Sequence, residues 1–235
     1  SRSAGIMAYD NFVDSRVSVA AGLFRGADDS YGNYKGDGYA STARLSGLPY
    51  LSEDASRLMH LAIGYSYRGD DTATYKLSSD HSLAPNWKYK VSDLDNTKVL
   101  SLEGALEFGP FSLQSEWVEA DVDASEVGNL DGYYVQAGYV LTGESRSYDQ
   151  TLGAFKGVSP SSEFMEDGGI GAWEAVLRWS NLDFSDLTPN QEIDTWTVGL
   201  KWYLNKNIRV MLNYSNAELN ADNVDVIATR FQLAF

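Results

Sequence analysis

The 235-residue chain contains no cysteine and only two histidines, His60 and His81. The absence of cysteine excludes a disulfide framework, a thiolate metal site and a cysteine nucleophile. The two histidines lie far apart in the sequence, and neither has a second histidine at the spacing of a metal ligand. We therefore expect no metal, no cofactor and no histidine-based catalytic site.

Basic residues are scarce, with 18 Lys and Arg against 33 Asp and Glu, which gives a formal net charge of −15. Nucleic acid is a poor partner for such a chain, because phosphate binding requires a basic face. Proline is also scarce at five, whereas the chain holds fifteen Tyr, nine Phe and six Trp. This composition favours strands over helices and over disorder.

The sequence has no run of about 18 apolar residues, so it predicts no transmembrane helix. A membrane-spanning strand requires only about 9–11 residues with every second one apolar, a pattern that hydropathy averaging conceals. The N-terminal SRSAGIMAYD has neither an initiator Met nor a signal peptide. It indicates processing or truncation upstream.

Apolar and polar or small residues alternate along most of the chain, and this period of two predicts strands throughout. In Thr195–Leu204 (TWTVGLKWYL), every second residue from Trp196 is apolar, and the residues between them are mostly polar or small. About eleven strands are predicted: Gly5–Val13, Arg16–Phe24, Tyr39–Leu48, Met59–Arg68, Leu100–Phe108, Phe111–Ala120, Asp131–Leu141, Gly171–Ser180, Thr195–Leu204, Ile208–Ser215 and a final strand ending in RFQLAF.

The predicted connections alternate in length. Short connections are expected at Val13–Arg16, Gly109-Pro110 and Asn205–Asn207, and long polar ones at Arg25–Gly38, Gly69–Asn96, Asp121–Leu130, Asp183–Ile193 and Glu218–Asn223. Outer-membrane barrels have short periplasmic turns and long extracellular loops. The long Ser145–Gly168 connection lies on the short-turn side, and we interpret it as an elaborated periplasmic turn.

Alternating strands also build soluble sandwiches, whose apolar face is the core. The many Trp and Tyr residues at the ends of the apolar faces favour a membrane barrel instead, because amphipathic rings are stable at the two membrane interfaces. The predicted fold is therefore all-β, a transmembrane antiparallel β-barrel.

Four segments together resemble the phosphate-selective porin O and P family: Leu141–Pro160 (LTGESRSYDQTLGAFKGVSP), Gly171–Ser180 (GAWEAVLRWS), Thr195–Ser215 and Arg230–Phe235 (RFQLAF). The resemblance covers essentially the whole chain. It implies a homotrimeric, anion-conducting barrel of about sixteen strands in the outer membrane of a Gram-negative bacterium.

Bacterial single-chain barrels have an even number of strands, so about eleven strands predict a fragment. Residues 1–235 are then one barrel domain without its N-terminal strands. The family's constriction loop is expected in that preceding part.

The face opposite the apolar one is predicted to line the channel. Its charged candidates are Arg44, Arg68, Arg178, Lys201, Arg209 and Arg230, against Glu103, Glu107, Glu116 and Glu174. The excess of basic side chains predicts a mild anion preference. Alternatively, these Arg and Glu residues only pair across neighbouring strands.

Phosphate-selective members of the family have a ladder of closely spaced arginines. No predicted strand here has Arg or Lys at positions i, i+2 and i+4, so the sequence assigns no phosphate-binding residue. The acidic loops could bind divalent cations and through them lipopolysaccharide. A solvated acidic surface is the simpler account.

The sequence therefore predicts an outer-membrane porin for passive diffusion of small, preferably anionic solutes, with membrane lipid and lipopolysaccharide as surroundings. One alternative is a barrel-anchored enzyme using His60 and Ser66, although no glycine-rich nucleophile turn flanks either residue. Another is an adhesin or assembly factor whose barrel is an anchor without an open pore.

Overall fold

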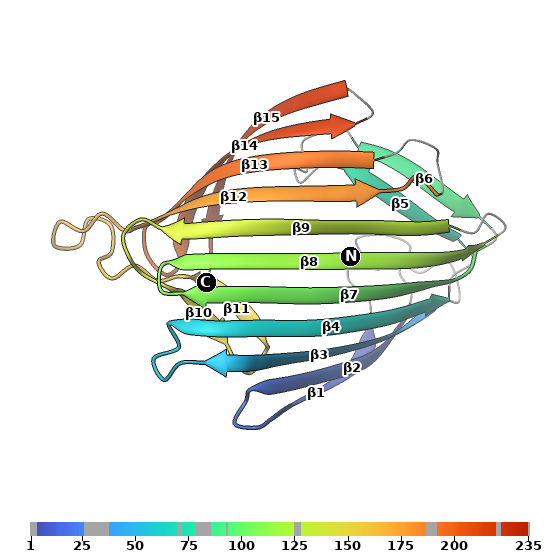
Figure 1. Cartoon of the computed structure of the whole chain (residues 1–235), viewed down its shortest axis with the longest axis horizontal. Coiled ribbons are helices and arrows are strands. Elements are labelled where there is room, and N and C mark those ends of the chain that lie inside the picture. The colour runs from blue at the N-terminus through green and yellow to red at the C-terminus, as the bar shows by residue number, and fades with distance from the viewer. Residues whose placement is uncertain are drawn as a thin grey trace.

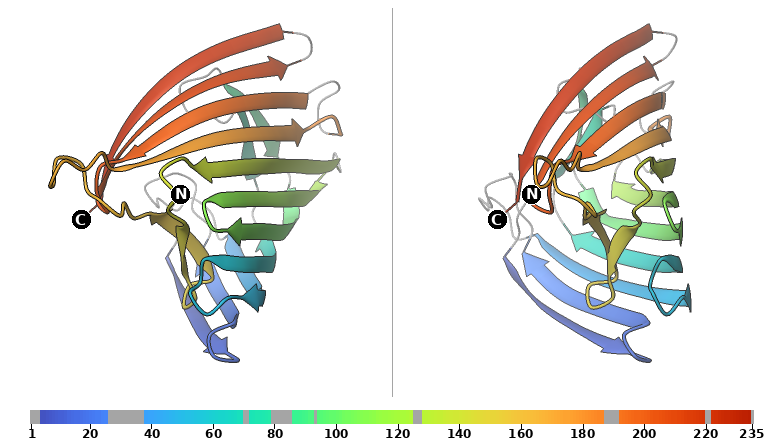
Figure 2. Two further views of the ribbon diagram at one scale, coloured as in Figure 1. Left: turned by 60° about the vertical axis from the view of Figure 1, so that its left-hand side comes forward. Right: turned by 90° about the vertical axis from the view of Figure 1, so that its left-hand side faces the viewer.

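A computed structural model describes residues 4–25, 38–69, 72–78, 86–92, 94–124, 128–186, 192–219 and 222–234, with backbone alone for 72–78, 86–92, 219 and 222. Eleven strands form one antiparallel sheet in the order β1-β2-β3-β4-β7-β8-β9-β12-β13-β14-β15. Each strand pairs with its neighbour along the barrel wall, and the sheet curves into a trough (Figures 1 and 2).

The strands of this sheet are β1 (Gly5–Phe12), β2 (Val17–Arg25), β3 (Tyr39–Leu51), β4 (Arg57–Gly69), β7 (Leu94–Phe108), β8 (Phe111–Ala124), β9 (Gly128–Val140), β12 (Ala172–Asp183), β13 (Glu192–Tyr203), β14 (Ile208–Leu219) and β15 (Asp222–Leu233). They confirm the eleven predicted strands.

Several strands extend beyond their predicted ends on the long-loop side. β8 continues to Ala124 and β9 begins at Gly128, so the long loop predicted at Asp121–Leu130 is wrong. The long loop predicted at Glu218–Asn223 is also wrong, because β14 continues to Leu219 and β15 begins at Asp222. Polar and acidic residues continue the β ladder there, because backbone pairing does not depend on apolar side chains once the hairpin register is set. The segment predicted to be a loop at residues 26–37 lies outside the described residues.

Two further hairpins fall inside predicted connections. β5 (Thr72–Ser78) pairs with β6 (Asn86–Ser92), and β10 (Arg146–Asp149) pairs with β11 (Ala154–Val158). The β10–β11 hairpin lies on the concave side of the sheet (Figure 2). No helix among the described residues is long and apolar enough to cross a bilayer.

Burial across the sheet is the reverse of that in a soluble protein. On the convex face, Leu177, Val198 and Leu212 are 48–58% exposed, whereas Glu174 and Thr195 on the concave face are at most 1% exposed. A sandwich would bury the first set and expose the second. The exposed apolar band therefore faces lipid, and the soluble sandwich is excluded.

Aromatic residues on the convex face form two girdles. The girdle at the short-turn end contains Phe108, Phe111, Tyr139, Trp173, Trp202 and Phe231, and the opposite girdle contains Tyr65, Tyr67, Trp117, Tyr133, Trp179, Trp196 and Tyr214. Between them lie aliphatic side chains such as Leu102, Val135 and Leu200. This is the arrangement expected where rings meet the two membrane interfaces.

The short turns are held by local hydrogen bonds. In the β3–β4 turn, Asp54 accepts bonds from the hydroxyls of Ser52 and Ser56 and from the Ser56 amide. These bonds stabilise the carboxylate and lower the pKa of Asp54 to about 2. In the β1–β2 turn, Val13, Asp14 and Ser15 all have φ between 53° and 60°, which reverses the chain within four residues.

Candidate functional site

All ten charged side chains singled out in the sequence lie on the concave face. They come from eight strands, and the pairing register places them there: Arg44 on β3, Arg68 on β4, Glu103 and Glu107 on β7, Glu116 on β8, Glu174 and Arg178 on β12, Lys201 on β13, Arg209 on β14 and Arg230 on β15. That they line a water-filled passage stays a prediction.

Arg44 and Glu103 form a bidentate ion pair that crosses the intervening strand β4. Nε and Nη2 of Arg44 lie 2.9 and 2.7 Å from the two carboxylate oxygens of Glu103. The residues of β4 beneath them include Ala62 and Gly64, which are small enough to let the long side chains pass. The pair is charge-assisted and fixed in direction, unlike a single-point contact.

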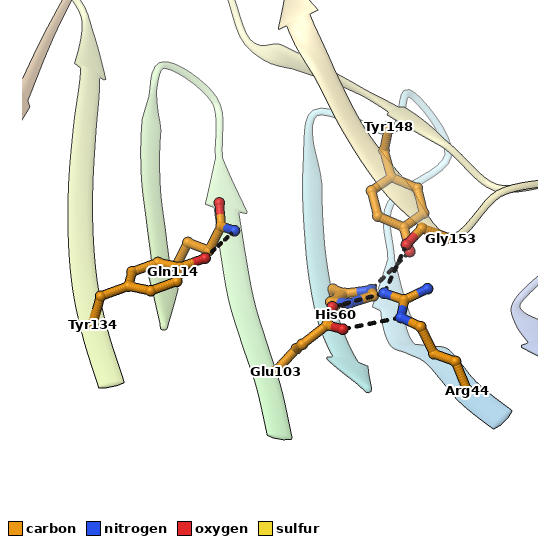
Figure 3. A network of polar contacts seen from close by, with 7 residues as sticks. All are labelled: Arg44, His60, Glu103, Gln114, Tyr134, Tyr148 and Gly153. Carbon is orange, nitrogen blue, oxygen red and sulfur yellow. Dashed lines mark hydrogen bonds and ion pairs between the residues drawn. The ribbon is translucent and has the colours of Figure 1, made fainter. Parts of the chain in front are cut away.

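His60 on β4 joins this pair to the β10–β11 hairpin. Its Nδ1 lies 2.7 Å from the Tyr148 hydroxyl, and its Nε2 lies 3.5 Å from Glu103 (Figure 3). Arg44 also donates to the carbonyl oxygen of Gly153 at 3.3 Å. Two wall residues, His60 and Arg44, therefore bond the hairpin directly, at Tyr148 of β10 and at Gly153 in the turn before β11.

Further contacts fix the hairpin along its length. The Arg146 amide donates to Glu107, and the Ser18 hydroxyl donates to the Gln150 carbonyl oxygen. Gly153 has φ of +60° and approaches the Ser46 hydroxyl so closely that a Cβ would overlap it. Its lack of a side chain thus permits the close contact between hairpin and wall.

The far end of the hairpin packs on an apolar cluster. Val158 is buried with Val140, Ala172 and Tyr203, beside the short-turn end of β13. A cavity of about 220 Å³ remains between hairpin and wall, lined by Arg44, His60, Gln114, Arg146 and Phe155 among others.

A second charged pair lies on β12 and β13. Lys201 Nζ is 3.2 Å from both oxygens of Glu174, and the Tyr203 hydroxyl donates to Glu174 at 2.7 Å. Glu174 is fully buried. Its charge is thus compensated from two directions, as burial of a carboxylate requires.

The remaining candidates have other partners. The Arg178 guanidinium lies 3.7 Å from the ring centroid of Tyr134, and Tyr134 accepts a hydrogen bond from Gln114 (Figure 3). Arg209 donates two bonds to Gln232. Of the charged candidates, Lys201 and Glu174 pair across neighbouring strands, whereas Arg44 and Glu103 pair across the intervening β4.

The hairpin is the part of the site that sequence reasoning missed. The Ser145–Gly168 connection was correctly placed at the short-turn end. Sequence reasoning did not predict that part of it forms a hairpin on the concave side of the sheet (Figure 2). The strand-like alternation in Arg146–Asp149 and Ala154–Val158 is too short to be distinguished from loop. The hairpin adds Arg146, Lys156 and Asp149 to the charged groups, and Lys156 pairs with Asp149 at 2.9 Å.

Two titrating groups of the hairpin have shifted pKa values. Burial raises the pKa of Tyr148 to about 12, so the hydroxyl keeps its proton. The hydrogen bond from Lys156 and those from the amides of Leu152 and Thr151 lower the pKa of Asp149. Among the described residues, no group of three His, Asp or Glu side chains could hold a metal ion.

His60 and Ser66 do not form a nucleophile pair. The Ser66 hydroxyl lies 2.9 Å from that of Thr42, while both ring nitrogens of His60 face Tyr148 and Glu103. The arrangement is that of a structural histidine in a polar network.

Comparison with known proteins shows which family and relatives the chain resembles. The family model for Phosphate-selective porin O and P matches residues 2–235. Porin O of Pseudomonas aeruginosa is 29% identical over 232 residues, which cover 77% of this chain and 50% of that protein. An uncharacterized protein of Caulobacter vibrioides is 30% identical over 134 residues, which cover 52% of this chain and 27% of that protein. The chain thus spans half the length or less of these relatives.

Proposed function

The chain belongs to the phosphate-selective porin O and P family of the bacterial outer membrane, and from this we propose that its concave face lines a water-filled channel for passive diffusion of small solutes. The observation that carries the proposal is the inverted burial, with charged and polar side chains on the inner face and apolar side chains outside. In a barrel, such a face encloses water.

The β10–β11 hairpin narrows this passage. It lies against the inner wall and is bound to it by Arg44, His60 and Glu107, from three different strands. A solute passing along β3, β4 and β7 therefore meets the hairpin as well as the wall.

The channel prefers anions mildly. Two of the six basic candidates, Arg44 and Lys201, are compensated by Glu103 and Glu174. The other basic side chains are distributed over β4, β12, β14 and β15 and do not form a vertical ladder. Such a wall lowers the barrier for anions without building a dedicated phosphate site.

The eleven strands are part of a larger, sixteen-stranded barrel that assembles as a homotrimer, as the family resemblance implies. β1 and β15 are the edges of the sheet, and open backbone edges are not stable in lipid. The partners at the surface are membrane lipid and lipopolysaccharide.

The protein acts as a channel and not as an enzyme or as a closed anchor for adhesive loops. The polar contacts of His60 and Ser66 are structural, which supports the first distinction. A conductance measurement distinguishes a channel from a closed anchor, because an anchor with a plugged lumen passes no large current.

The test uses the full-length protein in planar lipid bilayers. Stepwise currents are expected, and a variant with residues 145–159 replaced by a short Gly-Ser linker should give larger steps. The matched control replaces exposed positions 161 and 162 by Gly, outside the hairpin. Absence of steps in the unmodified protein would support an anchor, and equal steps in the linker variant would show that the hairpin does not narrow the channel.

A further inference from the structure

The connection between β9 and β12 sends its two halves to opposite faces of the barrel wall. The β10–β11 hairpin lies inside, whereas residues 163–170, here called the rim loop, turn to the lipid-facing side of β12 and β13. There the Phe164 ring contacts Trp202 edge-on at 4.7 Å between centroids. Trp202 in turn stacks on Trp173 at 5.1 Å. The rim loop is therefore continuous with the aromatic girdle of the short-turn end.

Hydrogen bonds attach the rim loop firmly to the barrel. The Phe164 amide donates to the Leu204 carbonyl oxygen at 2.7 Å, and Trp202 Nε1 donates to the Ile170 carbonyl oxygen at 2.8 Å. Both ends of the loop are thus bonded to the end of β13 or to the turn that follows it.

Within the loop, bonds between backbone groups close a compact turn. The Met165 amide donates to the carbonyl oxygen of Gly169, and the Gly169 amide donates to that of Glu166. Met165 and Asp167 have φ of 67° and 47°. Residues with a Cβ adopt this left-handed region only at an energetic cost, so the fold holds the loop in one defined shape.

This defined shape leaves apolar side chains uncovered. Met165 is 80% exposed, Ile170 60% and Phe164 39%. A single exposed apolar residue has no special meaning, but three on one fixed loop beside a lipid-facing aromatic girdle form a contact surface.

We propose that the rim loop dips into the lipid–water interface of the leaflet at the short-turn end and anchors the barrel there through Phe164, Met165 and Ile170. Apolar side chains gain free energy by entering the boundary between headgroups and acyl chains. The proposed partner is lipid, because the loop extends the exposed apolar face of Leu200 and Leu212 and continues its aromatic girdle. A second subunit at this position is an outcome that the test below distinguishes.

The charges of the rim loop define the headgroup that it prefers. It carries Glu163, Glu166 and Asp167, and residues 159–172 include no Lys or Arg. A negative lipid surface repels such a loop. Zwitterionic lipids with an ammonium group, such as phosphatidylethanolamine, offer these carboxylates a counter-charge, so they are favoured over phosphatidylglycerol.

The test places an environment-sensitive fluorophore at Met165→Cys in the full-length protein, reconstituted in phosphatidylethanolamine-containing vesicles. Lys206→Cys, in the β13–β14 turn at the same end, is the water-facing control, and Leu200→Cys is the control for the lipid face. The probe at position 165 should emit at shorter wavelength than that at 206 and be quenched by lipid spin-labelled near the glycerol backbone. Ile170→Cys provides a second position with the same expectation.

Emission and iodide quenching at 165 equal to those at 206 would overturn the proposal. Protection from iodide without quenching by spin-labelled lipid would also overturn it, since another subunit would then cover the loop. Exchange of the ethanolamine lipid for phosphatidylglycerol should reduce the lipid quenching at 165 and leave that at 200 unchanged. Equal quenching at 165 in both lipids would refute the headgroup preference.

Discussion

The hydroxyl of Tyr148 lies 2.7 Å from Nδ1 of His60 and joins the hairpin to a wall strand 88 positions away in the sequence. His60 Nε2 faces Glu103, whose carboxylate can only accept a hydrogen bond. In the neutral ring the proton therefore belongs on Nε2, and Nδ1 accepts from the Tyr148 hydroxyl. Because burial raises the pKa of Tyr148 to about 12, its hydroxyl remains a donor at physiological pH.

Tyr148→Phe should loosen the hairpin without unfolding the barrel. His60 is only 3% exposed, so loss of the hydroxyl leaves a buried acceptor without this donor. Such a loss costs about 1–3 kcal/mol, here of the free energy that docks the hairpin. Hydrogen exchange of residues 146–158 should become faster, whereas Tyr50→Phe, at an exposed lipid-face position, should not change it. Unaltered exchange in Tyr148→Phe would mean that other contacts hold the hairpin.

The strands of the wall could be predicted because one physical rule repeats along them. Each strand alternates between lipid and water, so a period of two marks both its existence and its faces. The ends on the long-loop side could not be predicted in this way. Residues such as Asp121 and Asp123 continue β8 through backbone pairing although their side chains break the pattern.

The faces of the charged candidates could be predicted, but their partners could not. Alternation places Arg44 and Glu103 on the same face, yet their ion pair depends on two strands that are not adjacent and on small residues between them. The hairpin contact of His60 depends on a segment 88 positions away in sequence. Local sequence patterns carry no information on contacts between residues that are so far apart in the sequence.

Adjacent positions on β14 provide a sharp test of the lipid face. Leu212 is 49% exposed on the convex side, and Asn213 points to the concave side opposite Gly199. Leu212→Arg should lower the free energy of unfolding by about 2–4 kcal/mol near the bilayer midplane, and Asn213→Arg by much less. Denaturant titration of the full-length protein in lipid vesicles measures both. Similar losses for the two variants would mean that the faces are misassigned.

The β10–β11 hairpin should loosen in acid, because the contacts of Asp149 lie within it. Asp149 binds Lys156 and the amides of Leu152 and Thr151, which lower its pKa below the ordinary 3.8. A carboxyl group with a lowered folded-state pKa stabilises the fold above its unfolded pKa, and this contribution is lost as the pH falls through the folded value. Channel steps should therefore increase as the pH falls below the ordinary carboxyl pKa of 3.8. Asp149→Asn should show the larger steps already at neutral pH and less change in acid. A pH response identical to that of the unmodified channel would exclude Asp149 as its origin.

Ion selectivity should depend on basic side chains that have no carboxylate partner. Arg209 donates to the neutral amide of Gln232, and Arg230 is exposed on the neighbouring strand. Lys201 is unsuitable for this test, because its removal would leave the fully buried Glu174 without its cation, which typically costs about 3–5 kcal/mol.

Neutralising both arginines, as Arg209→Gln with Arg230→Gln, should move the zero-current potential of the full-length channel in a salt gradient toward cation preference. Fixed charge acts on a permeating ion mainly within about 8–10 Å at physiological salt, so only lumen charges should matter. The control is Arg57→Gln, which removes one positive charge from the convex side, where the guanidinium lies 4.5 Å from the ring centroid of Phe108. It should leave the potential nearly unchanged, because the barrel wall separates it from the ion path. Equal shifts per charge removed in the two variants would place selectivity in the overall surface charge. A cation-selective unmodified channel would show that the concave face of these strands does not set the preference.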